Sequence, residues 1–210
     1  MERKNQGKLY RTDDPDLRKI QLSQLKLQEE FNRTSVSDQN RRIPLLQKMF
    51  EEFGKGSFVE GDIHANWGGY FCRVGKNVYI NFNLTMVDDG PILMEDDVMI
   101  GPNVTLISGS HPNDPELRKA LWQYTDPIVI HKNAWIGAGA ILLPGVEIGE
   151  NSIIGAGSVV RKSVPADCIA AGNPCRILRK LSEKDRLYYG NHQRIDLDEI
   201  EDRSSGSADL

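Results

Sequence analysis

The chain has 210 residues, of which 39% are hydrophobic and 27% charged, with a formal net charge of −4. This is the composition of an ordinary folded domain, and the absence of a basic block argues against a nucleic-acid partner. No apolar run reaches the length of about 18 residues that a membrane span requires, and the polar first residues do not resemble a secretory signal. Three cysteines without CxxC spacing indicate reduced thiols, so we expect a cytoplasmic protein of one large domain or of one domain with an appendage.

Two amphipathic helices are expected at the N-terminus. Asp14 and the proline after it form a helix start, and an apolar stripe then runs to about residue 32. After a polar break, a second helix is expected from about Asp38 to Phe53. Residues 1–55 would thus form a helical cap over an open end of the fold that follows.

Residues 56–165 carry a six-residue repeat that begins weakly at Phe58. The period is neither the 3.6 of a helix nor the 2 of a strand, and it is typical of a β-solenoid of stacked hexapeptides. A series of β-hairpins, the alternative, would show alternating hydrophobicity and two-residue turns. The large aliphatic residues of the clearest stretch are Ile130, Ile136, Leu142, Ile148, Ile154 and Val160.

Residues 107–127 interrupt the repeat with three prolines and no six-residue beat. Long insertions in compact repeats are often functional and tend to gather on one binding face. This one contains His111, whose imidazole could act as a general base on a hydroxyl group. A solvated loop histidine is the alternative interpretation.

Other polar residues near the coils are weaker candidates. Asn81 and Asn83 are turn formers or amides directed at a ligand. Asp88 and Asp89 fall in a two-residue bulge of the repeat, where an exposed acid pair could accept hydrogen bonds from hydroxyl groups. Trp135 should point outward, either as a subunit contact or as a surface on which a ligand stacks.

The last coil and the segment after it, residues 166–210, carry a basic group and an acidic tail. Lys162, Arg176 and Arg179 form either a solvated patch or a phosphate-binding patch. A short helix is expected within 181–190, followed by a Ser-rich acidic tail of disordered character.

A metal site is not expected. His64, His111 and His131 are scattered in the repeat register, and His192 lies in the tail. A γ-type carbonic anhydrase, a hexapeptide solenoid that holds its metal with three histidines, would require a paired spacing that this chain lacks.

Together these motifs resemble the galactoside and maltose O-acetyltransferases, the sugar-acetylating branch of the hexapeptide acyltransferases. The resemblance extends from Gly7 to Tyr189. It rests on the motifs Asn81-Phe82-Asn83-Leu84-Thr85, Val87-Asp88-Asp89, Gly101-Pro102-Asn103-Val104, His111-Pro112, Ala134-Trp135-Ile136-Gly137, Pro144-Gly145-Val146, Gly155-Ala156-Gly157-Ser158 and Ala171-Gly172-Asn173-Pro174.

The resemblance implies an all-β fold, a left-handed parallel β-helix with an N-terminal helical hairpin and a short C-terminal helix. It also implies a homotrimer with sites between subunits, acetyl-CoA as co-substrate, no permanently bound cofactor, and a sugar hydroxyl, commonly the 6-OH, as acceptor. By this likeness His111 is the base that takes the hydroxyl proton in a ternary complex, without an acyl-enzyme, and Asn81 assists it.

The resemblance also assigns binding residues. Acceptor contacts fall on Asp14 (or Asp13, in the neighbouring register), Asn66 and Asp89. Acetyl-CoA contacts fall on Trp135, Ala138, Ala156, Arg161, Lys162, Arg176 and Arg179.

Three positions depart from the family pattern. Trp67 stands where the family has tyrosine, Ala138 where some members have serine, and Arg161 where some have threonine. Two alternatives remain open: an acetyltransferase of the same fold acting on a non-sugar acceptor (an antibiotic hydroxyl or serine), and a non-catalytic trimeric scaffold.

Overall fold

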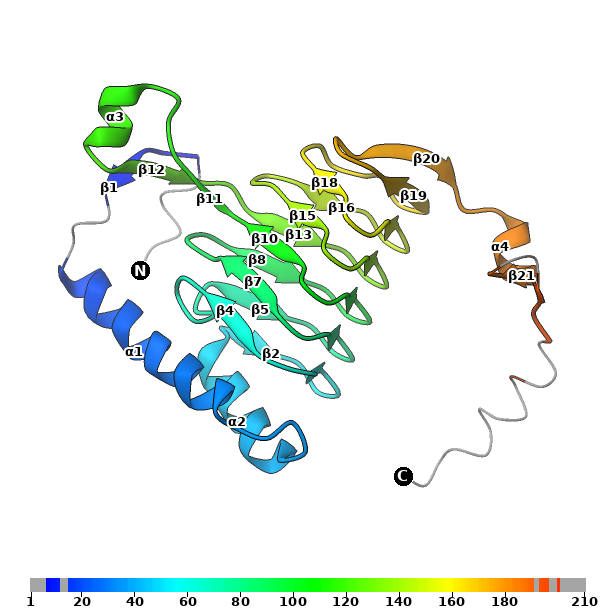
Figure 1. Cartoon of the computed structure of the whole chain (residues 1–210), viewed down its shortest axis with the longest axis horizontal. Helices are drawn as coiled ribbons and strands as arrows, with labels where there is room; N and C mark the ends of the chain where they lie inside the picture. The colour runs from blue at the N-terminus through cyan, green and yellow to red at the C-terminus, as the bar shows by residue number, and fades with distance from the viewer. Residues whose placement is uncertain (1–6, 12–14, 191–192, 197–199, 201–210) are drawn as a thin grey trace. The chain divides into compact units, whose positions relative to one another are not determined.

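The computed structural model describes residues 7–11, 15–190, 193–196 and 200. The chain divides into two units, Met1–Arg179 and Lys180–Leu210. The first unit is a stack of coils with a helical hairpin at one end and a projecting β-hairpin, as Figure 1 shows. None of the helices in the described part is long and apolar enough to cross a membrane.

The coils form three parallel sheets that share a common interior, because each turn of the chain contributes one short strand to each sheet. Within each sheet the strands stack in register, so that Thr105 of β10 lies between Thr85 of β7 and Ile141 of β15. The first sheet contains β2 (Glu52–Phe53), β5 (Cys72–Val74), β8 (Ile92–Met94), β13 (Ile128–Ile130) and β16 (Glu147–Ile148). The second contains β3 (Phe58–Val59), β6 (Tyr79–Ile80), β9 (Met99–Ile100), β14 (Trp135–Ile136), β17 (Ile153–Ile154), β19 (Cys168–Ala171) and β20 (Arg176–Lys180). The third contains β4 (Ile63–Ala65), β7 (Leu84–Val87), β10 (Thr105–Ile107), β15 (Ile141–Leu142) and β18 (Val159–Val160).

The repeat residues fill the interior as the period predicts. All six large aliphatics of the clearest stretch have 0% exposure, and so do small-register residues such as Ala134 and Ser158. The fold class expected from the sequence is therefore confirmed. In the first coil the inward-facing position is one residue later than the sequence predicted, because Val59 is the buried member of β3 and Phe58 is not.

The N-terminal helices are α1 (Pro15–Asn32) and α2 (Gln39–Met49), with Asp38 as the N-cap of α2. The expectation that the second helix reaches Phe53 is wrong. Phe50 already has extended backbone, and β2 pairs in parallel with β5. Gly54 directly follows β2 and lies where the chain turns and packs closely on the next coil. A Cβ at this position would lie only 2.2 Å from the carbonyl oxygen of Gly75.

Helix α1 covers β4, the edge strand of the third sheet, with a row of amide side chains. Asn32 bonds both the carbonyl and the N–H of Ile63, at 2.8 and 3.1 Å. Gln28 accepts from the N–H of Ala65 at 2.7 Å, and Gln21 donates to the carbonyl of Asn66 at 2.9 Å. The three amides thus satisfy backbone groups that an uncovered edge would leave unpaired.

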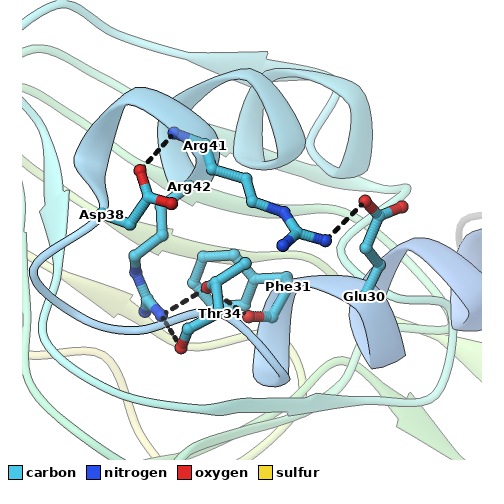
Figure 2. A network of polar contacts seen from close by, with 6 residues as sticks. All are labelled: Glu30, Phe31, Thr34, Asp38, Arg41 and Arg42. Atoms are coloured by element: carbon cyan, nitrogen blue, oxygen red, sulfur yellow. Dashed lines mark hydrogen bonds and ion pairs between the residues drawn. The ribbon is translucent and has the colours of Figure 1, made fainter.

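A buried arginine joins both helices to the first coil. Arg42 of α2 is 1% exposed and lies over the ring of Phe31, with its guanidinium carbon 4.1 Å from the ring centroid (Figure 2). Its guanidinium donates to the hydroxyl of Thr34 at 2.9 Å and to the carbonyl of Gly61 at 2.7 Å. Its neighbour Arg41 faces solvent, and Figure 2 shows it reaching Glu30 instead.

The insertion forms an antiparallel sheet that stands apart from the parallel ladders. β11 (Gly109–Ser110) and β12 (Trp122–Thr125) form a hairpin whose tip carries α3 (Pro115–Lys119). The N-terminal strand β1 (Tyr10–Arg11) adds to β12, with Tyr10 opposite Gln123. Residues near position 10 and residues near position 120 are thereby brought together.

The second unit contains α4 (Glu183–Leu187), whose capping box pairs Ser182 with Asp185. The short C-terminal helix is thus present, although the tyrosine pair expected at its end forms β21 (Tyr188–Tyr189), which pairs with β22 (Gln193–Arg194). The acidic tail after residue 200 lies outside the described residues. The three cysteines are buried and free of disulfide bonds.

Candidate functional site

The functional candidates gather at two corners of the coil. We call the turns between the third and first sheets, residues 66–71, 88–91, 108–127, 143–146 and 161–163, the loop corner. We call the turns between the second and third sheets, residues 81–83, 101–104, 137–140 and 155–158, the tight corner. Trp135, Arg176 and Arg179 lie on strands of the second sheet, whereas Asn66, Asn81, Asp89, His111, Ala138, Ala156, Arg161 and Lys162 fall on one of the two corners.

His111 lies at the loop corner, directly after β11, and its side chain is exposed. Its Nδ1 is 3.1 Å from the carbonyl oxygen of Trp122 on the paired strand β12. Because a carbonyl can only accept, Nδ1 carries the hydrogen, and the lone pair of the neutral ring is on Nε2. The hairpin therefore fixes the tautomer that a general base needs, with Nε2 free to take a proton.

The sequence predicted that Asp88 and Asp89 are both exposed, and this prediction is wrong for Asp88. Asp88 is 0% exposed, and its two carboxylate oxygens accept the N–H groups of Trp67 at 2.8 Å and Gly69 at 2.9 Å. Burial raises the pKa of Asp88 to about 6, and the two backbone donors only partly oppose this shift. Asp88 therefore holds the 67–69 turn and is not available to a ligand.

Asp89 is partly exposed and is held from three sides. Its Oδ1 accepts the indole N–H of Trp67 at 2.9 Å, and its Oδ2 lies 3.4 Å from the amide nitrogen of Asn66. The backbone of β11 passes close by, since a Cβ on Gly109 would lie 2.4 Å from Oδ2. Asn66 and Asp89, both predicted on the acceptor side, thus meet beside a strand whose next residue in the chain is His111.

The pair formed by Tyr10 and Gln123 was not predicted from the sequence. The Gln123 amide donates to the Tyr10 hydroxyl at 2.7 Å, and burial raises the pKa of Tyr10 to about 12. The phenol therefore remains a neutral hydroxyl beside the loop corner. The two residues are 113 positions apart, and no local pattern marks such a contact. Asp14 and its alternative Asp13 lie outside the described residues.

Asn81 lies at the tight corner, and the structure does not bring it to His111 within one chain. Its Oδ1 accepts the N–H of Phe82 at 2.8 Å. Asn83 takes the turn-forming role, with φ of +60°. Ala138 and Ala156 are exposed and stack at this corner on successive coils, the carbonyl of Ala138 accepting from Gly157 at 2.8 Å.

Trp135 faces outward from the second sheet, 47% exposed, as predicted. It belongs to an apolar row formed by the outward residues of successive strands, which is paired in register along the sheet. The row consists of Phe58, Tyr79, Met99, Trp135 and Ile153.

The predicted basic residues are all exposed. Arg161 and Lys162 follow β18 at the loop corner, whereas Arg176 and Arg179 lie on β20. The chain brings the two groups near each other, because Cys175 donates its N–H to the carbonyl of Val159 at 2.9 Å. The two groups therefore lie at the same end of the coil stack.

The other histidines have ordinary partners or lie elsewhere. His131 Nδ1 is 3.0 Å from a carboxylate oxygen of Glu95, and His64 lies on β4, exposed. His192 lies outside the described residues. Among the described residues, no group of three or more His, Cys, Asp or Glu could hold a metal ion.

Comparison with known proteins identifies the class. Residues 127–162 match the family described as bacterial transferase hexapeptide (six repeats), and residues 4–54 match the maltose acetyltransferase hexapeptide capping motif. The chain is thus a hexapeptide-repeat acyltransferase by fold and sequence.

Its relatives narrow this class. The chain is 46% identical over 192 residues to a galactoside O-acetyltransferase of Lactococcus lactis, covering 91% of this chain and 93% of the relative. A solved galactoside acetyltransferase in complex with coenzyme A superimposes with a TM-score of 0.87 at 40% identity, covering 90% of this chain and 94% of that one. A maltose O-acetyltransferase from Clostridium difficile 630 gives a TM-score of 0.81 at 38% identity, with 83% and 93% covered. The chain belongs to the galactoside and maltose O-acetyltransferase family, and it is an O-acetyltransferase.

Proposed function

We propose that this enzyme transfers the acetyl group of acetyl-CoA to a hydroxyl of a galactoside, glucoside or maltose-type sugar, at the 6-OH. The observation that carries the proposal is the His111 tautomer, with the Nε2 lone pair free at the corner that also holds the carboxylate of Asp89. The names of the relatives support sugar O-acetylation with acetyl-CoA.

The reaction follows from these groups. Nε2 of His111 removes the proton of the acceptor hydroxyl while that oxygen attacks the thioester carbonyl. The tetrahedral intermediate then expels the CoA thiolate, which takes the proton back from the imidazolium. The Trp122 carbonyl accepts a hydrogen bond from Nδ1 throughout, and this contact stabilises the positive charge on the ring. No acyl-enzyme forms, because both substrates are bound together.

The second group of predicted residues is assigned to acetyl-CoA. The exposed Ala138 and Ala156 leave a smooth strip at the tight corner along which a pantetheine arm can lie, with Trp135 on the adjoining sheet. Arg161, Lys162, Arg176 and Arg179 supply cations for its phosphates.

A homotrimer would bring His111 and Asn81 together in one site. His111 and Asn81 lie at different corners and on successive coils, so a single chain does not bring them together. Packing three copies around an axis would place the tight corner of one chain beside the loop corner of the next, and the site would then lie between subunits. The exposed apolar row of the second sheet is a surface that such packing could cover.

The test measures release of CoA thiol from acetyl-CoA with galactosides, glucose, maltose, chloramphenicol and serine as acceptors. Sugar-dependent release is expected, and His111→Ala should lower it by about 100-fold or more while CoA still binds. The control is His131→Gln, which removes a surface histidine that bonds Glu95. Equal turnover of His111→Ala and wild type would refute the assigned base. Release only with chloramphenicol or serine would refute the sugar acceptor, and no release at all would favour a scaffold.

A further inference from the structure

The side chain of Trp67 is almost completely buried beside the candidate acceptor site, and its one polar atom has a specific partner. The residue is 7% exposed, and its indole N–H donates to Oδ1 of Asp89 at 2.9 Å. Its ring also packs edge-on against Phe71, with the centroids 5.4 Å apart. The ring is therefore held by packing while its N–H is used on a carboxylate, and hydrogen bonds to charged groups are the stronger kind.

The turn that carries Trp67 is itself fixed from both sides. Asp88 accepts the backbone N–H groups of Trp67 and Gly69, as described above. On the other side α1 packs directly against Gly68, since a Cβ there would lie 2.8 Å from the carbonyl oxygen of Gln24. The two adjacent acids therefore have different roles, since Asp88 holds the backbone of the turn whereas Asp89 receives the side chain of Trp67.

These contacts leave Oδ2 as the less occupied oxygen of Asp89. Oδ1 is occupied by the indole, whereas Oδ2 has only the longer contact of 3.4 Å to the amide of Asn66. We propose that Trp67 is a positioning residue of the acceptor site: it fixes the Asp89 carboxylate so that Oδ2 accepts a hydrogen bond from a hydroxyl of a neutral polyhydroxylated acceptor. The inference rests on the proposed function and adds to it the residue that orients the acceptor.

The experiment compares Trp67→Phe, which keeps a ring and removes the N–H, with wild type. The KM for the acceptor should rise roughly 10- to 100-fold, the effect expected for one lost hydrogen bond to a charged group. The KM for acetyl-CoA should be unchanged. Trp67→His, which retains an N–H donor on a smaller ring, should recover part of the loss. The packing control is Phe71→Leu, which disturbs the same ring contact but keeps the N–H, and it should raise the acceptor KM much less than Trp67→Phe does.

A double-mutant cycle separates positioning from simple packing. If Trp67 acts through Asp89, Trp67→Phe should have little further effect in an Asp89→Asn background, whereas independent effects would add. A readout that needs no turnover is the indole N–H signal of Trp67 in an NMR spectrum, which Asp89→Asn should shift and expose to solvent exchange.

The possible failures can be told apart. A wild-type enzyme that transfers acetyl groups to no hydroxylated acceptor refutes the proposed function, and with it a role in acceptor binding. An active wild type with an equally active Trp67→Phe variant, or with additive effects in the cycle, refutes only the role of Trp67.

Discussion

Replacing Arg42 by methionine should loosen the helical hairpin from the first coil. Methionine fills a similar volume, so the change removes the guanidinium without opening a large cavity. The buried carbonyl of Val59 and the half-buried carbonyl of Gly61 would lose a donor that now lies 3.3 and 2.7 Å away, and the hydroxyl of Thr34 would lose its bond as well.

The expected loss follows from opposing effects. Each hydrogen bond from a charged donor contributes about 1.5–3 kcal/mol, and the stacking over Phe31 adds to this. Against these, burial disfavours the charge and lowers the pKa of Arg42. A net loss of about 2–4 kcal/mol in the free energy of unfolding is expected, since both carbonyls lose this donor and that of Val59 is left buried.

The adjacent residue supplies the control. Arg41 carries the same side chain one position earlier, but it is exposed and pairs with Glu30 at 3.3 Å (Figure 2). Such surface pairs contribute little, so Arg41→Met should change the free energy of unfolding by less than about 1 kcal/mol.

Two assays would measure the effect. Equilibrium denaturation at fixed protein concentration gives the free energy, because assembly makes apparent stability concentration-dependent. Hydrogen exchange of the backbone amides of α1 and α2 detects detachment of the hairpin alone, which is expected first since coils contact only their neighbours. Equal midpoints and equal exchange for Arg42→Met and Arg41→Met would refute the assigned role.

Two further predictions concern the loop corner. Because burial raises the pKa of Asp88 to about 6, its protonated form is favoured in the folded state, so its contribution to the free energy of unfolding is complete below about pH 4 and is lost as the pH rises through about 6. The pH-dependent loss in the free energy of unfolding should amount to roughly 3 kcal/mol at most, and the Asp88→Asn variant should not show it. Identical pH profiles of unfolding for wild type and Asp88→Asn would count against this account. Gly109→Ala would place a Cβ 2.4 Å from Oδ2 of Asp89, so the KM for the acceptor should rise while the KM for acetyl-CoA stays constant. Steady-state kinetics with varied acceptor concentration would measure this change. An unchanged acceptor KM would mean that the carboxylate moves freely.

The sequence predicted the coils well because every coil repeats the same requirement. Each inward position must be apolar, and the residue at the following bend must be small or β-branched, so the signal recurs at every sixth residue. The sequence-based prediction failed where the second helix meets the first coil. The apolar residues Leu46, Met49, Phe50 and Phe53 keep a helical spacing, although the helix ends at Met49. The switch depends on Phe53 pairing beside Val74, a contact between strands that no local pattern contains.

The candidate site was less predictable because its contacts join distant segments. Asp88 and Asp89 are adjacent and chemically identical, yet only the fold shows that one is buried against the N–H groups of Trp67 and Gly69. The polar character of Asp88 suggested exposure, but paired donors some 20 residues away satisfy it. The resemblance to a family implied acceptor contacts at Asp89 and Asn66, and the structure places the Asn66 amide nitrogen 3.4 Å from Oδ2 of Asp89.

The two corners differ in how they are built, and this difference has a consequence for specificity. The tight corner consists of the repeat itself, and its successive coils are joined by backbone hydrogen bonds such as that from the N–H of Gly157 to the carbonyl of Ala138. The loop corner is assembled from additions to the repeat: the bulge at Asp89, the turn at Trp67, the inserted hairpin and the N-terminal strand. Substitutions there can alter the acceptor side while the coils that would hold the CoA arm keep their geometry. We therefore expect acceptor preference to vary within this family through these additions to the repeat, independently of acetyl-CoA binding.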